Sequence, residues 1–153
     1  MFILTGLRPW CATPPTGANW PGSLGACPRP RRMDIPVILA GDYNIIPIKR
    51  DVYNPDRWRD DALFLPQVQK AYAALLKQGW HDAIGTIHSD KALYTFWDYL
   101  RHAWKRNAGL RLDHLLLSPE SAPRLKNAGV DRDIRGRSKA SDHAPAWIVL
   151  DTA

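Results

Sequence analysis

The stretch Val-Ile-Leu-Ala-Gly-Asp-Tyr-Asn at residues 37–44 constrains the fold more than any other. Four apolar residues that run into Gly41 are typical of a buried strand. Asp42 and Asn44 come next, and they point to the same side if the chain stays extended. A carboxylate and an amide at a strand end suit a binding site at the edge of an α/β sheet. The simpler alternative is an Asx turn, in which both side chains bond to the nearby backbone.

Two later stretches place further polar residues beside apolar strands. Residues 110–118 predict a strand that carries Asp113, and a buried carboxylate needs a partner such as an imidazole. Residues 141–145 read Ser-Asp-His-Ala-Pro and precede the apolar run 146–150. Because neighbours in an extended segment point to opposite sides, Asp142 could hold a metal while His143 faces a substrate.

Together these stretches form an ordered set of motifs, which lie at residues 41–45, 94–99, 107–118 and 139–147. In this order the set resembles the endonuclease/exonuclease/phosphatase superfamily, and most closely its bacterial exonuclease III branch, from about residue 35 to 150. The resemblance implies a DNA-repair nuclease that hydrolyses phosphodiesters with Mg²⁺ or Mn²⁺, trimming 3′ ends and cutting beside abasic sites. It also implies an α/β fold, half of the family's four-layer sandwich, with one mixed, mainly antiparallel sheet and helices on one face.

The resemblance assigns roles to particular residues. Asp42, Asn44, Asp113 and His143 would be catalytic, with Asp113 bonded to the imidazole, and Asp142 would bind the metal together with Asp42. The substrate would contact residues of the aromatic segment and of the strand before Asp113, namely Phe96, Trp97, Leu110, Leu112 and Arg111. For Trp97 the alternative is a place in the core.

Residues 1–32 differ in composition from the rest. They hold six of the thirteen prolines and four arginines but no acidic residue, and nothing in them is periodic. We expect them to be a leader outside the fold, and residues 33–153 to be the C-terminal part of an exonuclease III-like domain. The family's metal-binding Glu, expected before the first motif, has no counterpart, because Glu120 is the only glutamate. The sequence therefore predicts a truncated enzyme, weakly active or inactive alone. The alternative is a non-catalytic half-domain that binds DNA weakly or self-associates.

Charge and composition suggest partners and location. Basic residues follow the first and second motifs, and they would either contact phosphates or form ordinary solvated loops: Lys49, Arg50, Arg57, Arg59, Arg101, Lys105 and Arg106. The resemblance implies duplex DNA with 3′ ends or abasic sites as a partner, and a complementing N-terminal half or a second copy as another. No apolar run is long enough for a transmembrane helix, so we expect no membrane partner. Two cysteines cannot form a disulfide framework, so we expect a cytoplasmic protein.

Periodicity predicts two helices. Residues 66–79 place Val68, Tyr72, Leu75 and Leu76 on one face, between a proline suited to the first turn and a glycine suited to the end. A second helix would start at Ser118 as N-cap and close near Gly129.

Overall fold

The structure is a computed structural model that describes residues 2–4 and 35–152. Most of the predicted leader, residue 1 and residues 5–32, lies outside these ranges. Phe2–Leu4 forms strand β1, which pairs in parallel with the start of the next strand. The domain boundary at residue 33 stays a prediction.

The described strands form two sheets. In the first, β2 (Val37–Asp42) and β4 (Asp113–Leu117) are antiparallel and central, with β1 beside β2 and β3 (His81–Asp82) beside β4. The second sheet pairs β5 (Leu125–Val130) with β6 (Ala146–Leu150). The α/β class and its mixed, mainly antiparallel pairing are confirmed. The expected single sheet is divided in two because β5 and β6 pair with each other and pack across the first sheet.

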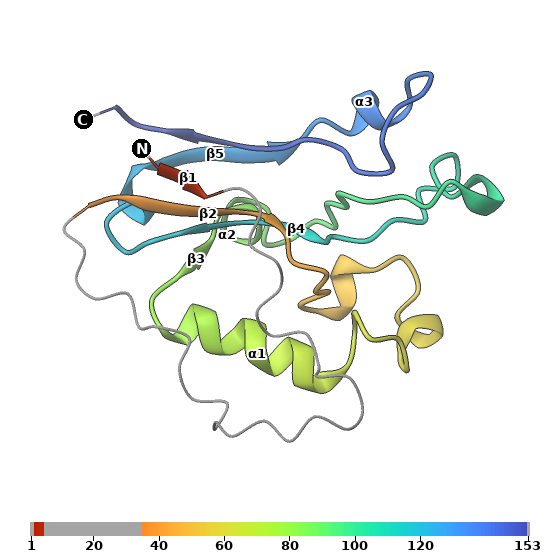
Figure 1. Cartoon of the computed structure of the whole chain (residues 1–153), viewed down its shortest axis with the longest axis horizontal. Helices are drawn as coiled ribbons and strands as arrows, with labels where there is room; N and C mark the ends of the chain where they lie inside the picture. Colours follow the sequence, from red (N-terminus) through yellow and green to blue (C-terminus); the bar gives the residue numbers. More distant parts are fainter. Residues whose placement is uncertain (1, 5–34, 153) are drawn as a thin grey trace.

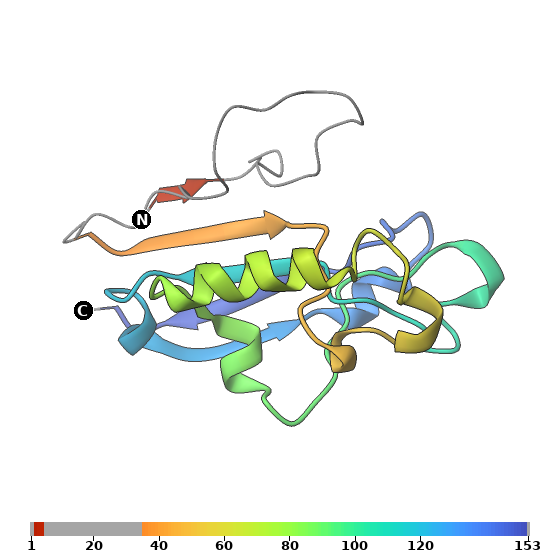
Figure 2. The ribbon, with the colours of Figure 1, turned by 90° about the horizontal axis from the view of Figure 1, so that it is seen from below.

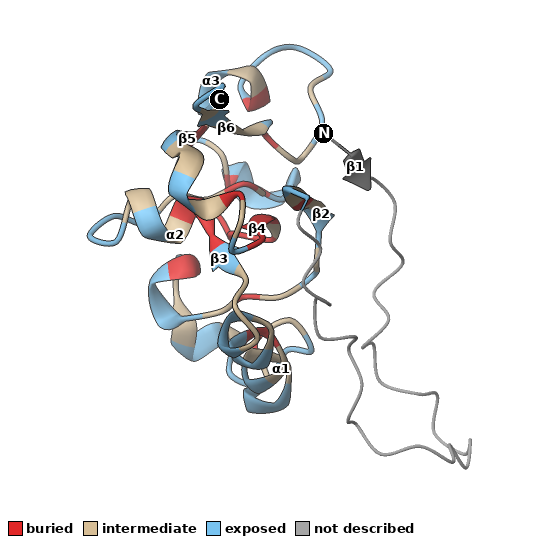
Figure 3. Cartoon of the chain, turned by 90° about the vertical axis from the view of Figure 1, so that its left-hand side faces the viewer, coloured by how far each residue is buried: buried red, intermediate tan, exposed pale blue. Residues whose placement is uncertain are grey.

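Helix α1 (Pro66–Lys77) covers the face of the first sheet opposite β5 and β6 (Figures 1 and 3). It confirms the first predicted helix. Pro66 occupies the first turn, where its missing N–H costs no hydrogen bond. Gly79 has φ 103°, a left-handed conformation that a side chain would strain. Tyr72 is the buried residue of this helix, and it therefore points toward the sheet.

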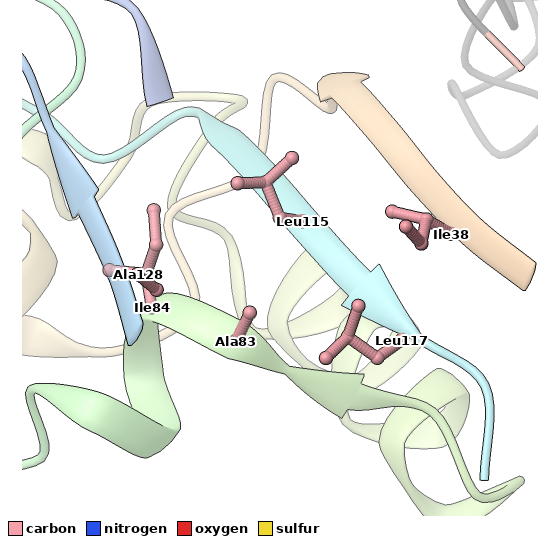
Figure 4. Close-up of a cluster of buried hydrophobic side chains, with 6 residues drawn as sticks. All are labelled: Ile38, Ala83, Ile84, Leu115, Leu117 and Ala128. Atoms are coloured by element: carbon pink, nitrogen blue, oxygen red, sulfur yellow. The ribbon is translucent and has the colours of Figure 1, made fainter. Parts of the chain in front are cut away.

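The main hydrophobic core lies between the two sheets (Figure 4). The short helix α2 (Ala83–Ile87) contributes Ala83 and Ile84, and its first turn is capped by the side chain of Asp82. Strands β2, β4 and β5 supply the remaining buried members, which are Ile38, Leu115, Leu117 and Ala128. Because Leu115 and Leu117 alternate with His114 and Leu116, the other side of β4 faces α1.

The predicted helix from Ser118 to Gly129 is wrong. One turn forms after Ser118, where the amides of Ser121 and Ala122 donate to its carbonyl. Pro123 follows within the 3₁₀ turn, and a proline at that point cannot continue the backbone hydrogen-bond series of a helix. The chain then runs as β5, which pairs with β6 from Leu125 to Val130, with a register shift between Leu125 and Asn127.

Short helical segments and loops fill the end of the molecule farthest from the C-terminus (Figures 1 and 2). The elements there are η1 (Lys49–Asp51), η2 (Pro55–Trp58), η3 (Leu100–His102) and α3 (Arg132–Arg135). The last 3₁₀ turn, η4 (Ala122–Arg124), joins β4 to β5. No helix among the described residues is long and apolar enough to cross a membrane.

Candidate active site

Two carboxylates face each other across the central strand pair. Asp42 is the last residue of β2 and Asp113 the first of β4, and the antiparallel register places them directly opposite. Residues opposite each other in such a ladder point to one face, with Cβ atoms about 5 Å apart. Their side chains are 37% and 21% exposed. The sheet thus holds two solvent-accessible carboxylates together at the end where the loops gather.

His143 reaches these carboxylates through the aromatic segment 94–99. This segment belongs to neither sheet. It is extended and makes isolated bridges instead, at which Phe96 pairs with Leu110 on one side and with His143 on the other. Phe96 thus stands between Leu110 and His143. The effect is to set His143 beside the first residues of β4.

The imidazole of His143 lies between the two carboxylates. Its Nδ1 is 2.7 Å from Oδ2 of Asp113, and its Nε2 is 4.0 Å from Oδ2 of Asp42. A carboxylate at neutral pH only accepts hydrogen bonds, so Nδ1 carries the proton. This hydrogen bond, aided by the charges of Asp113, Asp42 and Asp142, raises the pKa of His143. We call Asp42, Asp113 and His143 the open cluster.

Asn44 stands beside the open cluster on a tight turn. Its backbone N–H donates to Oδ1 of Asp42 at 2.9 Å, so the Asx turn expected as the simpler interpretation is present. The backbone of Asn44 is left-handed, with φ 51°, which asparagine tolerates better than most residues. The turn occupies Oδ1 of Asp42 and leaves Oδ2 directed toward His143. The Asn44 side chain is exposed.

Asp142 is half-buried and follows a small hydrogen-bonded turn. The Ser141 hydroxyl donates to Oδ1 of Asp142 at 3.4 Å and accepts the N–H of His143 at 3.1 Å. The carboxylate oxygens of Asp42 and Asp142 are hard donors of the kind that Mg²⁺ uses, usually one or two carboxylates with water and substrate oxygens. The donor chemistry therefore fits the ion. Within the described residues no group of three or more acidic, His or Cys side chains is arranged to complete such a site.

The predicted substrate-contacting residues differ in exposure. Phe96 is half-buried, and its ring meets that of His143 edge to face with centroids 5.1 Å apart. Leu110 and Leu112 are each 3% exposed, and Trp97 is 1% exposed, as expected of core residues. Phe96 is therefore the member of this set that presents surface beside the open cluster.

Comparison with known proteins agrees with this geometry. The sequence model of the Endonuclease/Exonuclease/phosphatase family matches residues 5–143, most of the chain. The chain belongs to this family. The resemblance to its exonuclease III branch is confirmed by a relative, exodeoxyribonuclease III of Haemophilus influenzae, which is 35% identical over 121 residues.

Solved structures of this family share the fold of the chain. A Neisseria 3′ phosphatase, NExo, bound to a product DNA hairpin is 34% identical with a TM-score of 0.74, and the match covers 76% of this chain. An AP endonuclease from Archaeoglobus fulgidus is 32% identical, also with a TM-score of 0.74, over 78% of this chain. The chain spans less than half the length of these relatives. The matches cover 46% and 47% of the two solved chains and 45% of the Haemophilus protein, with 73% of this chain aligned to the latter.

Arg111 lies apart from the open cluster of this family member. Its side chain is 5% exposed, and it donates to Asp82 at 2.6 Å and to Asp51 at 2.9 Å. The expected contact between Arg111 and substrate is therefore not available in this structure, because both ends of the guanidinium are occupied by buried carboxylates. Neither Asp51 nor Asp82 belongs to a recognised motif, so no sequence pattern indicated this arrangement.

Thr95 is a second residue that sequence reasoning missed. It is fully buried, and its hydroxyl accepts the N–H groups of Leu112 and Asp113, each at 3.0 Å. Its carbonyl accepts the N–H of Ala144 at 2.7 Å. Thr95 thus joins the start of β4 to the residue that follows His143. Its place between two aromatic residues in the motif was the only available signal.

His114, the neighbour of Asp113, is also bonded but on the opposite side of β4. Its ring is fully buried, with Nε2 3.0 Å from the carbonyl oxygen of Ile45 and Nδ1 3.2 Å from the hydroxyl of Tyr72. Burial, together with the positive charge of Arg111, lowers the pKa of His114 to about 4. We call the set Asp51, Tyr72, Asp82, Arg111 and His114 the closed network.

Proposed function

We propose that this chain carries part of the catalytic centre of a DNA-repair nuclease of the exonuclease III type. The reaction is metal-dependent hydrolysis of a phosphodiester, as in a 3′–5′ exonuclease or an abasic-site endonuclease. The observation that supports it is the open cluster, in which a carboxylate-bound imidazole faces a second carboxylate at 4.0 Å. A histidine with only a structural role is typically buried, whereas His143 is part-exposed and lies between two part-exposed carboxylates.

Each group of the open cluster suits one part of this chemistry. Asp42, with Oδ2 free of the Asx turn, orients or deprotonates the attacking water, and general-base help of this kind is typically worth about 10²–10⁴ in rate. His143 donates from Nε2 to a phosphoryl oxygen. Asp113 accepts from Nδ1 and so orients the ring. Donation from Nε2 needs a ring protonated on both nitrogens, and the raised pKa of His143 favours that state. Asn44, exposed beside Asp42, holds that carboxylate and contacts the phosphate.

Mg²⁺ or Mn²⁺ is the expected cofactor. Asp142 and Asp42 would hold it through carboxylate oxygens, and a further oxygen donor outside the described residues would complete the set. When bound, the ion neutralises charge that develops on the phosphoryl group.

DNA is the proposed substrate, as duplex with 3′ ends or abasic sites. The related Neisseria protein is bound to a DNA hairpin. In this chain Phe96 contributes an aromatic surface beside His143, which would stack on a base or fill the space left at an abasic sugar. The exposed cations Arg101, Lys105 and Arg106 follow on the next loop and are suited to backbone phosphates. A cytoplasmic location stays a prediction.

The chain by itself is proposed to be weakly active or inactive. It spans 45% of the Haemophilus exodeoxyribonuclease III, so much of that enzyme has no counterpart here, and two carboxylates alone hold a metal poorly. A complementing N-terminal half, or a second copy of the chain, would supply what is missing. The same coverage favours the second candidate function, a non-catalytic half-domain that binds DNA weakly or self-associates.

Incision of a duplex with one abasic site, in the presence of Mg²⁺, tests the proposal. The chain is assayed alone and with a separately produced N-terminal half of the Haemophilus enzyme. We expect little incision alone and clear incision with the half, lost in Asp42→Asn and in His143→Ala. Absence of incision although the two chains associate would favour the non-catalytic half-domain. Full incision by the chain alone, lost in Asp42→Asn, would show that no complementing half is needed.

A further inference from the structure

The turn that carries Asn44 is held at several points. On its first side the N–H of Tyr43 donates to the carbonyl of Leu112 at 3.0 Å. On its last side Ile46 is fully buried, its N–H donates to the carbonyl of Leu63 at 2.8 Å, and its carbonyl accepts from Gln69 at 3.3 Å. Between these anchors the backbone passes through the left-handed conformation of Asn44. A left-handed non-glycine residue persists where its surroundings fix it.

His114 bonds to the centre of this turn, at the carbonyl of Ile45. A carbonyl only accepts, so Nε2 of His114 carries the proton, and Nδ1 is left to accept the hydroxyl of Tyr72. The Tyr43 ring also meets the imidazole edge to face, with centroids 5.5 Å apart. Helix α1 is thereby connected, through Tyr72 and His114, to the residue after Asn44.

We propose that His114 is a positioning residue for Asn44, acting through the Ile45 carbonyl. The proposal rests on the proposed function, since it names what holds a catalytic residue of that site. The neutral ring with its proton on Nε2 provides a buried donor at Ile45, between the anchors at Tyr43 and Ile46. The ring itself contacts no substrate, because it is fully buried on the α1 side of β4.

A simple packing role for His114 gives a different expectation. An apolar ring of similar size would then serve as well, and its loss would weaken the whole fold evenly. Two polar atoms of one imidazole, each with its own partner in a fully buried position, instead indicate a directed connection. The two roles differ in where a substitution loosens the protein.

Amide hydrogen exchange in the whole chain, without DNA or metal, separates these roles. His114→Phe keeps a ring but removes both hydrogen bonds, whereas His114→Gln keeps a donor and an acceptor. In His114→Phe we expect exchange at the amides of Tyr43 and Ile46 to rise about tenfold or more, the factor that corresponds to one lost buried hydrogen bond. We expect the β4 amides to change far less, and His114→Gln to restore most of the protection. Equal acceleration at every amide, or none at Tyr43 and Ile46, would overturn the proposal.

A measurement on the unsubstituted protein covers the case in which His114→Phe does not fold. The ¹⁵N shifts of the His114 ring at neutral pH should report a neutral imidazole with its proton on Nε2. A ring protonated on Nδ1 alone could not donate to the Ile45 carbonyl, and a ring protonated on both nitrogens would not be the neutral donor that the proposal names; either result would overturn the proposal. Because neither measurement uses DNA, a failure here is distinct from an absence of nuclease activity.

Discussion

The two faces of β4 place aspartate and histidine side chains in opposite environments, one part-exposed and one buried. Asp113 points to the open cluster, where a part-exposed carboxylate binds a part-exposed imidazole. His114, one position later, points to the closed network, where every member is buried and the carboxylates bind a guanidinium. Because consecutive residues of a strand alternate in direction, one dipeptide serves both regions.

The difference appears most clearly in the two histidines. The Asp113 carboxylate raises the pKa of His143, whereas burial lowers the pKa of His114 to about 4. The lesson is that Asp-His as a sequence does not define a function for its histidine. Solvent contact and the nearest charge decide whether a histidine ring is protonated and can act as a proton donor, or stays neutral and holds its neighbours by hydrogen bonds.

The largest loss of folding stability should come from removing Arg111, the cation of the closed network. Arg111→Met would leave Asp51 and Asp82 buried without their partner, and breaking such a pair typically costs about 3–5 kcal/mol. Urea unfolding measures the loss. Arg59→Met is the matched control, because the Arg59–Asp56 pair is exposed and such pairs contribute about 1 kcal/mol or less. Equal stability of the two variants would show that the closed network is not a stabilising unit.

The next largest effect is a dependence of folding stability on pH, caused by His114. In the unfolded chain His114 binds a proton near pH 6.5, but in the folded protein only near pH 4, so the unfolded state binds more protons between these values. The free energy of unfolding should therefore decrease as the pH falls from 6.5 to 4, by up to about 3 kcal/mol from this residue. Urea midpoints across this range measure the slope. His114→Gln should flatten it, and an unchanged slope in that variant would contradict the assignment.

A smaller effect is expected at Thr95, which joins the two regions at the start of β4. Thr95→Val keeps the shape but removes the hydroxyl that accepts two N–H groups, and unsatisfied buried donors typically cost about 1–3 kcal/mol. Thr95→Ser keeps the hydroxyl and is the control. Thermal unfolding should rank Thr95→Val below Thr95→Ser, and the reverse order would show that the branched methyl group matters more than the hydrogen bonds.

The sequence predicted the open side of β4 much better than the closed side. Its motifs contain Asp42, Asp113 and His143, and the expected bond between the last two is present. Asp42 and Asp113 also lie at the ends of strands that hydrophobic patterning identifies, and His143 precedes the apolar strand β6. The positions of the strands and of helix α1 could be predicted for the same reason, since their apolar residues follow a regular pattern.

The closed network could not be predicted, because its partners come from distant, unpatterned segments. Arg111 meets Asp51 across 60 positions, and Tyr72 meets His114 across 42. A pattern of spacing within one element does not report such pairs. The missed strand β5 has a local cause, since the one-turn helical start at Ser118 is stopped by Pro123.

The smallest expected effect sharpens the comparison within the open cluster itself. Asp113→Asn replaces the charged acceptor of Nδ1, which is the main cause of the raised pKa of His143, so that pKa should fall. Asp42→Asn, whose carboxylate lies 4.0 Å from Nε2, should lower the pKa less. NMR titration of the His143 ring measures both. A raised pKa means that His143 adds stability below about pH 6.5 and that this stability is lost as the pH rises through the folded-state value, the opposite sign to His114. If Asp42→Asn shifted the titration more than Asp113→Asn, the imidazole would be held chiefly by Asp42, and the role of Asp113 as the residue that fixes the tautomer would be wrong.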